Sequence, residues 1–303
     1  MYPDNSWYSH RNIFARYCRV KLNIPIFGSL LHGHIAISEH KPTQIGHLGK
    51  RKFSIAPAFL WNNKQLEYSK RNGNKNIYAI GAPFLYLHKL KKNLFKKNKK
   101  KGTIVFPIKN DFSNIQDNTL INLLRIVEKR FPKPYTLSLS HQDFKHIKKP
   151  IKNWKIITCG PRNDIRFLYK LYKFLNKNEI IISTYAGSVV LYSLFLKKKT
   201  FIIDKCIDIK KKKIFFNREH HNFHLNVLKD FKKYGIDNYN LNLKKNYKGV
   251  LKILGYDCLK DREELKELLG WNGIIKIFCA KLFVLFYDFV KGKNLRKLGK
   301  YDL

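Results

Sequence analysis

Residues 179–203 constrain the fold of this chain more than any other stretch. The run 180–182 is short, apolar and β-branched, which predicts a strand buried on both faces of a parallel sheet. A turn of small residues follows, a helix is predicted over 188–196, and a second strand begins at Thr200. This stretch therefore predicts a βαβ unit within an α/β protein.

The turn inside this unit consists of small residues, namely Ser183, Thr184, Ala186, Gly187 and Ser188. Small side chains let a ligand approach the backbone amides and the positive end of the following helix, an arrangement that suits phosphate groups. The turn thus predicts a site for a nucleotide diphosphate. Turns of this kind also occur in α/β proteins that bind nothing there, and this one is less specific than a glycine-rich nucleotide motif.

The alternation of strand and helix extends back to residue 103. Strands are predicted at 103–108, 135–139, 154–158 and 180–182, with helices at 118–129 and 164–175. This pattern describes half of a doubly wound fold, in which ligands bind beyond the carboxyl ends of the strands. The loops predicted to converge on such a site are 107–110, 140–143, 160–163 and 183–188.

The first hundred residues contain shorter segments. A helix is predicted around 12–20, and strand-like segments at 24–38, 53–61 and 77–87 alternate with polar stretches, which again indicates an α/β arrangement. His32 and His34 follow the first of these strands. The lysine-rich stretch 89–101 predicts a linker between two halves, with a contact to a membrane surface or to RNA as the alternative.

The formal charge of +40 suggests an anionic partner. However, lysines outnumber arginines by 49 to 12, whereas bidentate phosphate or base recognition favours arginine. Nucleic acid is therefore a less favoured partner than anionic substrates or the anionic inner face of a membrane. Five widely spaced cysteines and an amino terminus without signal-peptide features predict a cytoplasmic protein.

The carboxyl-terminal part is predicted to be helical. An amphipathic helix is expected at 261–269, and the apolar segment 274–290 predicts either an interfacial helix beside anionic lipid or a packed helix. His220 and His224 have a spacing that could hold a metal on a helix, but no H-E-x-x-H pattern accompanies them. No metal site is therefore predicted.

Several short segments together resemble a family of short bacterial GT-B-like glycosyltransferases of capsule, lipopolysaccharide and other surface-glycan biosynthesis. These segments are 32–34, 56–57 with 60–62, 80–86, 103–107, 159–164 with 167–168, 183–194 and 263–271. They cover most of residues 30–271 as short pieces. Gly160-Pro161-Arg162 departs by one residue from the adjacent Gly-Arg pair of the family, which leaves the role of Arg162 open.

The resemblance implies two Rossmann-like halves with a cleft between them. Residues 1–100 would form the acceptor-side half, 101–260 the half that binds the nucleotide-sugar donor, and 261–303 helices that include a basic, apolar segment. It implies a nucleotide site at Gly160 and Arg162, with the phosphates at Ser183, Thr184, Gly187 and Ser188. The acceptor would be a glycan or a lipid-linked molecule, and no cofactor is implied.

The chemistry of glycosyl transfer adds two expectations. The sequence contains no D-x-D motif, so a helix terminus and basic side chains are expected to neutralise the leaving phosphates without a metal. An inverting transfer needs a general base near neutral pH, for which His32 and His34 are the candidates, although either can also be a structural histidine. The alternatives are a GT-B-fold nucleotide-sugar epimerase and a non-enzymatic RNA-binding or membrane-adaptor protein.

Overall fold

The computed structural model describes residues 3–33, 56–91, 101–107, 118–147, 150–203, 227, 229, 231–232, 243–273, 278 and 282. His34 lies outside the described residues, as do the histidines at 220, 221 and 224, the loop 108–110, residues 92–100 of the lysine-rich stretch and nearly all of the apolar segment 274–290.

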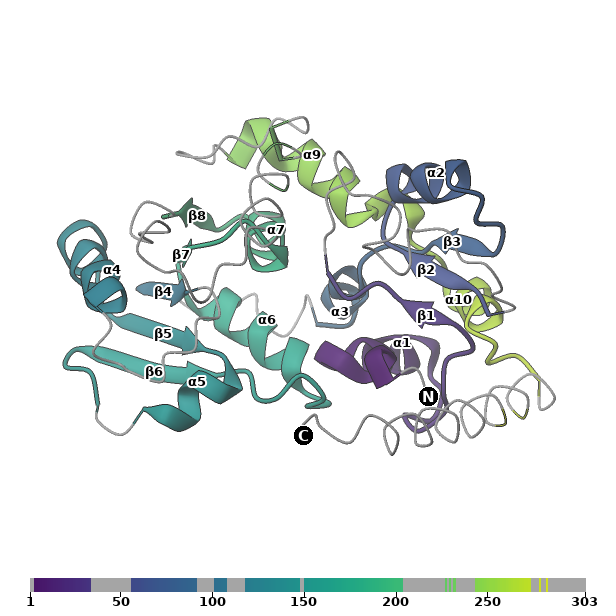
Figure 1. Cartoon of the computed structure of the whole chain (residues 1–303), viewed down its shortest axis with the longest axis horizontal. Helices are drawn as coiled ribbons and strands as arrows, with labels where there is room; N and C mark the ends of the chain where they lie inside the picture. Colours follow the sequence, from purple (N-terminus) through teal and green to yellow (C-terminus); the bar gives the residue numbers. More distant parts are fainter. Residues whose placement is uncertain are drawn as a thin grey trace, which may run out of the picture.

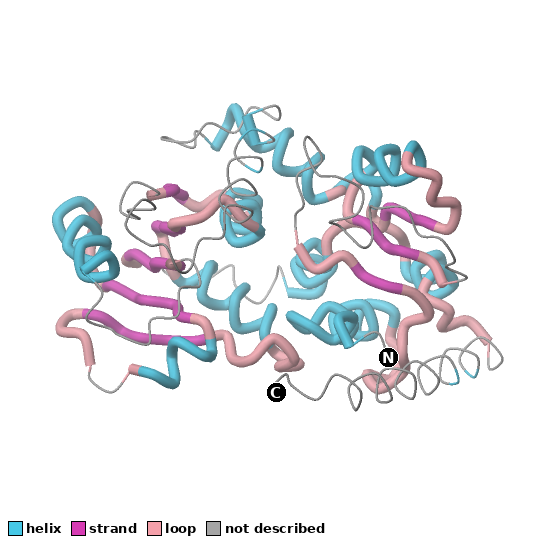
Figure 2. Tube along the Cα trace, viewed as in Figure 1, coloured by secondary structure: helices cyan, strands magenta, loops and turns pink. Residues whose placement is uncertain are grey.

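Two parallel sheets organise the described residues (Figures 1 and 2). The first sheet has the order β1-β2-β3, with β1 at Ser29–Leu30, β2 at Ala58–Leu60 and β3 at Ile77–Ala79. The second has the order β6-β5-β4-β7-β8, with β4 at Thr103–Phe106, β5 at Tyr135–Leu139, β6 at Trp154–Thr158, β7 at Ile180–Ser183 and β8 at Lys199–Ile202. All pairings are parallel, which confirms the predicted α/β class.

The second sheet has a doubly wound topology. The chain builds outward from β4 to β6 on one side and then crosses to β7 and β8 on the other, so Thr103 of β4 pairs with Tyr135 and with Ile180. The strand order therefore reverses between β4 and β7. Both central strands are apolar and buried, as expected when helices cover both faces of a parallel sheet.

Helices surround the two sheets. They are α1 at His10–Cys18, α2 at Asn63–Arg71, α3 at Pro83–Lys91, α4 at Asn118–Arg130, α5 at His141–His146, α6 at Phe167–Lys177, α7 at Ser188–Phe195, α9 at Leu243–Leu254 and α10 at Arg262–Leu268. The helices predicted at 118–129, 188–196 and 261–269 agree with α4, α7 and α10. Helix α6 begins three residues later than predicted, because Asp164 closes a turn by accepting a hydrogen bond from the Arg166 backbone.

The segment 77–87 differs from its prediction. Only Ile77–Ala79 is a strand, and Pro83 begins the helix α3, which continues to Lys91. The apolar run 84–87 is buried on all sides, so it lacks the polar face that marks a surface helix. Proline at the first helical position, where its missing amide costs nothing, was the available indication.

The helices between the two sheets share one hydrophobic core (Figure 1). Phe84 of α3 stacks on Tyr192 of α7 with ring centroids 4.0 Å apart. Helix α9 contacts residues from both sides: Asn62 donates a hydrogen bond to the Ile253 carbonyl, and Lys197 lies 5.2 Å from the centre of the Tyr247 ring. Among the helices of the described residues, none has the length and apolar character needed to cross a membrane.

Candidate active site

The carboxyl ends of β4 and β7 form the topological switch point of the second sheet, where ligands of doubly wound proteins bind. The Thr184 amide donates a 3.2 Å hydrogen bond to the Phe106 carbonyl, which ties the turn after β7 to the end of β4. The predicted convergence of these two strand ends is therefore present in the structure as far as residue 107.

Ser183 holds the turn between β7 and α7 in shape. Its hydroxyl donates to the Tyr185 carbonyl at 2.8 Å and accepts from the Tyr185 amide at 3.3 Å. Thr184 and Ala186 are buried, so neither side chain projects into solvent. The Ser183 hydroxyl thus bonds the backbone of the turn and holds its shape. The sequence alone could not distinguish this structural role from the predicted binding of phosphate.

Gly187 occupies the N-cap position of α7. Glycine has no side chain with which to cap the amides of the first turn. A Cβ added to Gly187 would lie 3.3 Å from the Tyr185 ring, and its φ of −148° is an extended conformation that any residue can adopt. The backbone conformation therefore does not require glycine at this position, whereas the Tyr185 ring leaves little room for a side chain.

The residues after β1 lie against the start of α7. A Cβ on Gly33 would be 3.3 Å from the Ser188 hydroxyl oxygen. The carboxyl end of β1 in the first sheet and the amino end of α7 beside the second sheet are therefore neighbours, although 155 positions separate Gly33 from Ser188 in the sequence. His32 directly precedes Gly33, and both nitrogens of its ring are buried.

His32 is packed among aromatic rings from the amino-terminal segment. Its ring centroid lies 5.3 Å from Trp7 and 5.8 Å from His10, and the two imidazoles are inclined by only 26°. His10 is buried, and burial together with the nearby His32 holds the pKa of His10 well below 6.5. His10 is consequently neutral at physiological pH, so it adds no positive charge beside His32.

Trp7 connects His32 with the predicted nucleotide-binding loop. The Arg162 guanidinium lies 5.3 Å from the Trp7 ring, and the Tyr8 amide donates a 2.6 Å hydrogen bond to the Arg162 carbonyl. Tyr8 and Ser9 both have the left-handed conformation, with φ of 55° and 66°. Non-glycine residues adopt it at a cost, and here it directs the backbone of 8–9 toward the loop 160–164.

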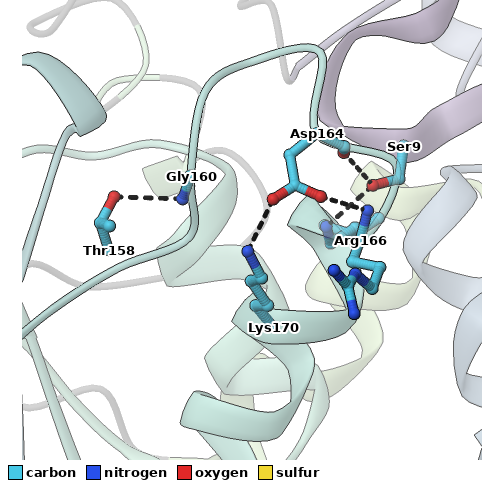
Figure 3. Close-up of polar contacts among 7 residues, drawn as sticks. Ser9, Thr158, Gly160, Asp164, Arg166 and Lys170 are labelled. Atoms are coloured by element: carbon cyan, nitrogen blue, oxygen red, sulfur yellow. Dashed lines mark hydrogen bonds and ion pairs between the residues drawn. The ribbon is translucent and has the colours of Figure 1, made fainter.

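Gly160 shapes this loop (Figure 3). Its φ of +91° favours glycine, and a Cβ would lie 2.6 Å from the carboxylate of Asp164. Its amide donates to the Thr158 hydroxyl at 3.1 Å. Gly160 is therefore required for the loop to fold over Asp164, whatever its contact with a nucleotide.

Asp164 is a structural residue of the loop, as expected of a turn aspartate. It forms a 2.6 Å ion pair with Lys170, accepts from the Arg166 amide at 2.7 Å, and its carbonyl accepts from Ser9 Oγ at 2.9 Å (Figure 3). Partial burial raises the pKa of the carboxyl group, but Lys170 and the Arg166 amide outweigh burial and hold it below 3.8.

Replacing Asp164 with asparagine is expected to lower the free energy of unfolding by about 1–2 kcal/mol at neutral pH, because Lys170 loses a charged partner. Since the folded-state pKa is depressed, the stabilisation is complete above about 3.8 and disappears as the pH falls through the lower folded-state value. Urea unfolding of both proteins at several pH values measures this difference. The exposed pair Lys199–Glu179 is the control, where Glu179→Gln should cost less than about 0.5 kcal/mol; equal losses would contradict the special role of Asp164.

The structure connects the segment 32–33 with two parts of the predicted donor site, the start of α7 and the loop that contains Arg162. His32 lies near Ser188 through Gly33, and near Arg162 through Trp7. Sequence analysis missed the segment 7–10, which supplies these connections. In the sequence this segment is only a run of aromatic and polar residues without periodicity. The structure shows that Ser9 and His10 in it are buried.

No three histidine, cysteine or acidic side chains gather to form a metal site within the described part of the chain. Its three cysteines, Cys18, Cys159 and Cys258, are buried and unpaired, and burial raises the pKa of each thiol above 9.0. These thiols are therefore protonated and unreactive at neutral pH.

No protein-family model matches the chain, and a search of curated proteins finds no match. Among solved structures, the chain is similar to the UDP-GlcNAc 2-epimerase of Methanocaldococcus jannaschii in complex with UDP-GlcNAc and UDP, with 16% identity, a TM-score of 0.35, and coverage of 76% of this chain and 61% of that one.

The chain is also similar to TarM of S. aureus in a complex that contains UDP, with 12% identity, a TM-score of 0.33, and coverage of 90% of this chain and 53% of that one. For the wall teichoic acid polymerase TagF the identity is 15%, the TM-score 0.31, and the coverage 81% of this chain and 57% of that one. This chain thus spans between about half and three fifths of each of these proteins. At such TM-scores the likenesses assign no activity to it.

Proposed function

We propose that the protein is a glycosyltransferase that transfers a sugar from a nucleotide-sugar donor to a cell-surface glycan or a lipid-linked acceptor. One observation carries the proposal: the start of α7, whose N-cap residue is a glycine, lies at the switch point of a doubly wound sheet, and its Ser188 meets Gly33 from the segment after β1. The helix terminus is thus a neighbour of the segment 32–33, which carries an imidazole, and a transfer reaction with a phosphate leaving group needs both an anion site and a base.

The donor phosphates are proposed to bind at Gly187 and Ser188, where the amides of the first turn of α7 and its dipole stabilise negative charge. Charge that develops on the leaving nucleotide would be stabilised there without a metal. Arg162 is exposed and packs on Trp7, so its guanidinium is available to the nucleotide from the side of the loop 160–164. Ser183 and Thr184 would support the turn from within.

His32 is the proposed base, which would accept the proton of the acceptor hydroxyl as the new glycosidic bond forms. The neutral, buried His10 stacked on it adds no charge that would oppose proton uptake. His34 stays a candidate from the sequence. The acceptor is proposed to lie on the side of the first sheet, with the protein at the cytoplasmic face of a membrane.

The epimerase alternative needs acidic groups on both sides of the sugar. Asp164, which directly follows the loop 160–163, is engaged by Lys170 and by the Arg166 amide. This engagement favours the transferase over the epimerase.

A nucleotide panel tests the proposal. Thermal unfolding measured with UDP, GDP, CMP and CDP is expected to show stabilisation by one of them, since a ligand at 100 times its dissociation constant adds about 2.7 kcal/mol. Gly187→Leu should remove this shift, because the leucine side chain would occupy the approach to the α7 amides. The variant alone is expected to unfold at a somewhat lower temperature, since its Cβ would lie 3.3 Å from the Tyr185 ring. Stabilisation by none of the nucleotides, or an unchanged shift in the variant, would contradict the donor site.

A further inference from the structure

Three helices bring a group of basic residues together, which we call the cationic patch: Arg16 of α1, Lys89 and Lys91 of α3, and Lys173 of α6. Arg16 and Lys91 each lie 5.7 Å from the centre of the Tyr169 ring, on α6. Lys89 lies 5.9 Å from the centre of the Tyr17 ring, on α1. Lys173 is one helical turn beyond Tyr169 and therefore shares its face.

The patch faces solvent. Arg16, Lys89 and Lys173 are exposed, and so is Leu90, which lies between the two lysines of α3. Figure 1 shows α1, α3 and α6 meeting in the central part of the molecule, between the two sheets. The patch therefore draws on both halves of the chain.

Within the described residues, no member of the cationic patch has an ion-pair partner. The ion pairs among these residues involve other lysines: Lys170, Lys199, Lys260 and Lys266. Two cations that share the Tyr169 ring repel each other, and the ring provides only part of the compensation. An anionic partner would relieve this repulsion.

The surroundings of the patch favour lipid headgroups over nucleic acid. Its tyrosine rings lie beneath cations, and the Tyr169 hydroxyl is buried, so these rings are less available for base stacking than an open aromatic surface. Three of the four cations are lysines, which act as point charges rather than as bidentate readers of phosphate. The sequence adds six further lysines with Leu94 and Phe95 in the next ten positions, which is a polybasic and apolar composition.

We propose that the cationic patch binds the anionic phospholipid surface of a membrane. The proposal deepens the membrane-side location contained in the proposed function, but it concerns binding and does not require sugar transfer. Bound in this way, α1, α3 and α6 would face the bilayer, which would bring the first sheet and its acceptor side close to a lipid-linked substrate.

Co-sedimentation with vesicles tests this proposal. The full chain is expected to bind phosphatidylcholine vesicles that contain phosphatidylglycerol and to dissociate from them when salt is added. It should not bind vesicles of pure phosphatidylcholine. The triple variant Arg16→Gln, Lys89→Gln, Lys91→Gln should bind about 100-fold more weakly, at roughly fivefold for each basic residue at the surface.

The matched control carries Lys70→Gln, Arg71→Gln and Lys75→Gln. It also removes one arginine and two lysines, from exposed positions on and after α2, which lies away from the patch in Figure 1. Its binding should change by less than about threefold, because charges distant from the contact are screened. Nucleotide-induced thermal shifts, measured on both variants, show separately whether the donor site is intact.

Equal weakening in the two triple variants would assign vesicle binding to net charge and overturn the patch. Wild-type binding to neutral vesicles, or none to anionic ones, would overturn it as well. If the patch variant lost affinity for a single-stranded RNA oligonucleotide but kept its affinity for vesicles, the surface would belong to nucleic acid. Loss of vesicle binding with a preserved nucleotide shift would support the patch independently of the transfer reaction.

Discussion

Replacing Gly255 with alanine is expected to lower the free energy of unfolding by about 3 kcal/mol or more. Gly255 ends α9 with a φ of +69°, and a Cβ there would overlap the carbonyl oxygen of Trp61 and lie 2.6 Å from its carbonyl carbon. Backbone atoms cannot rotate away as a side chain can. The tight contact also aligns α9 with the first sheet, where the Ala82 amide donates to the Leu254 carbonyl at 2.8 Å.

Gly73→Ala is the matched control for this prediction. Gly73 also has a positive φ, of +84°, but a Cβ there would have nothing within 4 Å. Its replacement should therefore cost only the conformational strain of about 1–2 kcal/mol. Chemical unfolding of the two variants separates strain from overlap, and equal losses would mean that α9 does not approach Trp61 as closely as described.

Replacing His32 with glutamine is expected to lower the turnover of the donor by about 10²–10⁴-fold, the usual contribution of a general base. Donor binding should persist, because the phosphates are proposed to bind the α7 terminus and not the imidazole. The measurement is the rate of nucleotide release from the donor sugar identified by the panel, together with the nucleotide-induced thermal shift of the same variant.

His88→Gln serves as the comparison for His32. His88 lies on α3, where its Nδ1 is 2.8 Å from the Tyr172 hydroxyl and its ring packs on Phe195, in the core and not at the site. This variant should lose stability but keep its turnover per folded molecule. Turnover of the His32 variant within about threefold of wild type would reject His32 as the base, since a base contributes at least about 100-fold.

Local patterns predicted the second sheet well. The strands 135–139 and 154–158 agree with β5 and β6 at both ends, and the helix predicted over 188–196 agrees with α7 to one residue. These elements have the periodicity or the β-branched composition that matches their secondary structure. The start of α10 is also marked locally, because the Asp261 side chain accepts a hydrogen bond from the Glu264 amide there.

The first sheet was harder to predict because its elements are short and fully buried. Strand β1 contains only two residues, and the first five residues of α3 are all buried, so neither shows an alternation of polar and apolar positions. A buried apolar run suits a strand and a helix equally well when periodicity is the only criterion. Tertiary contacts, such as the stacking of Phe84 on Tyr192, decide between them.

The sequence by itself determined the βαβ unit at 179–203, its small-residue turn and the alternation of strands and helices, because these depend on residues close together in the chain. Only the tertiary structure decided what faces that turn. Gly33 meets Ser188 and Trp7 meets Arg162 although about 155 positions separate the residues of each pair, and Trp7 also packs on His32. The segment 7–10 shows no helical or strand periodicity, because its side chains fit the loop and the helix against which they pack rather than one face of a regular element.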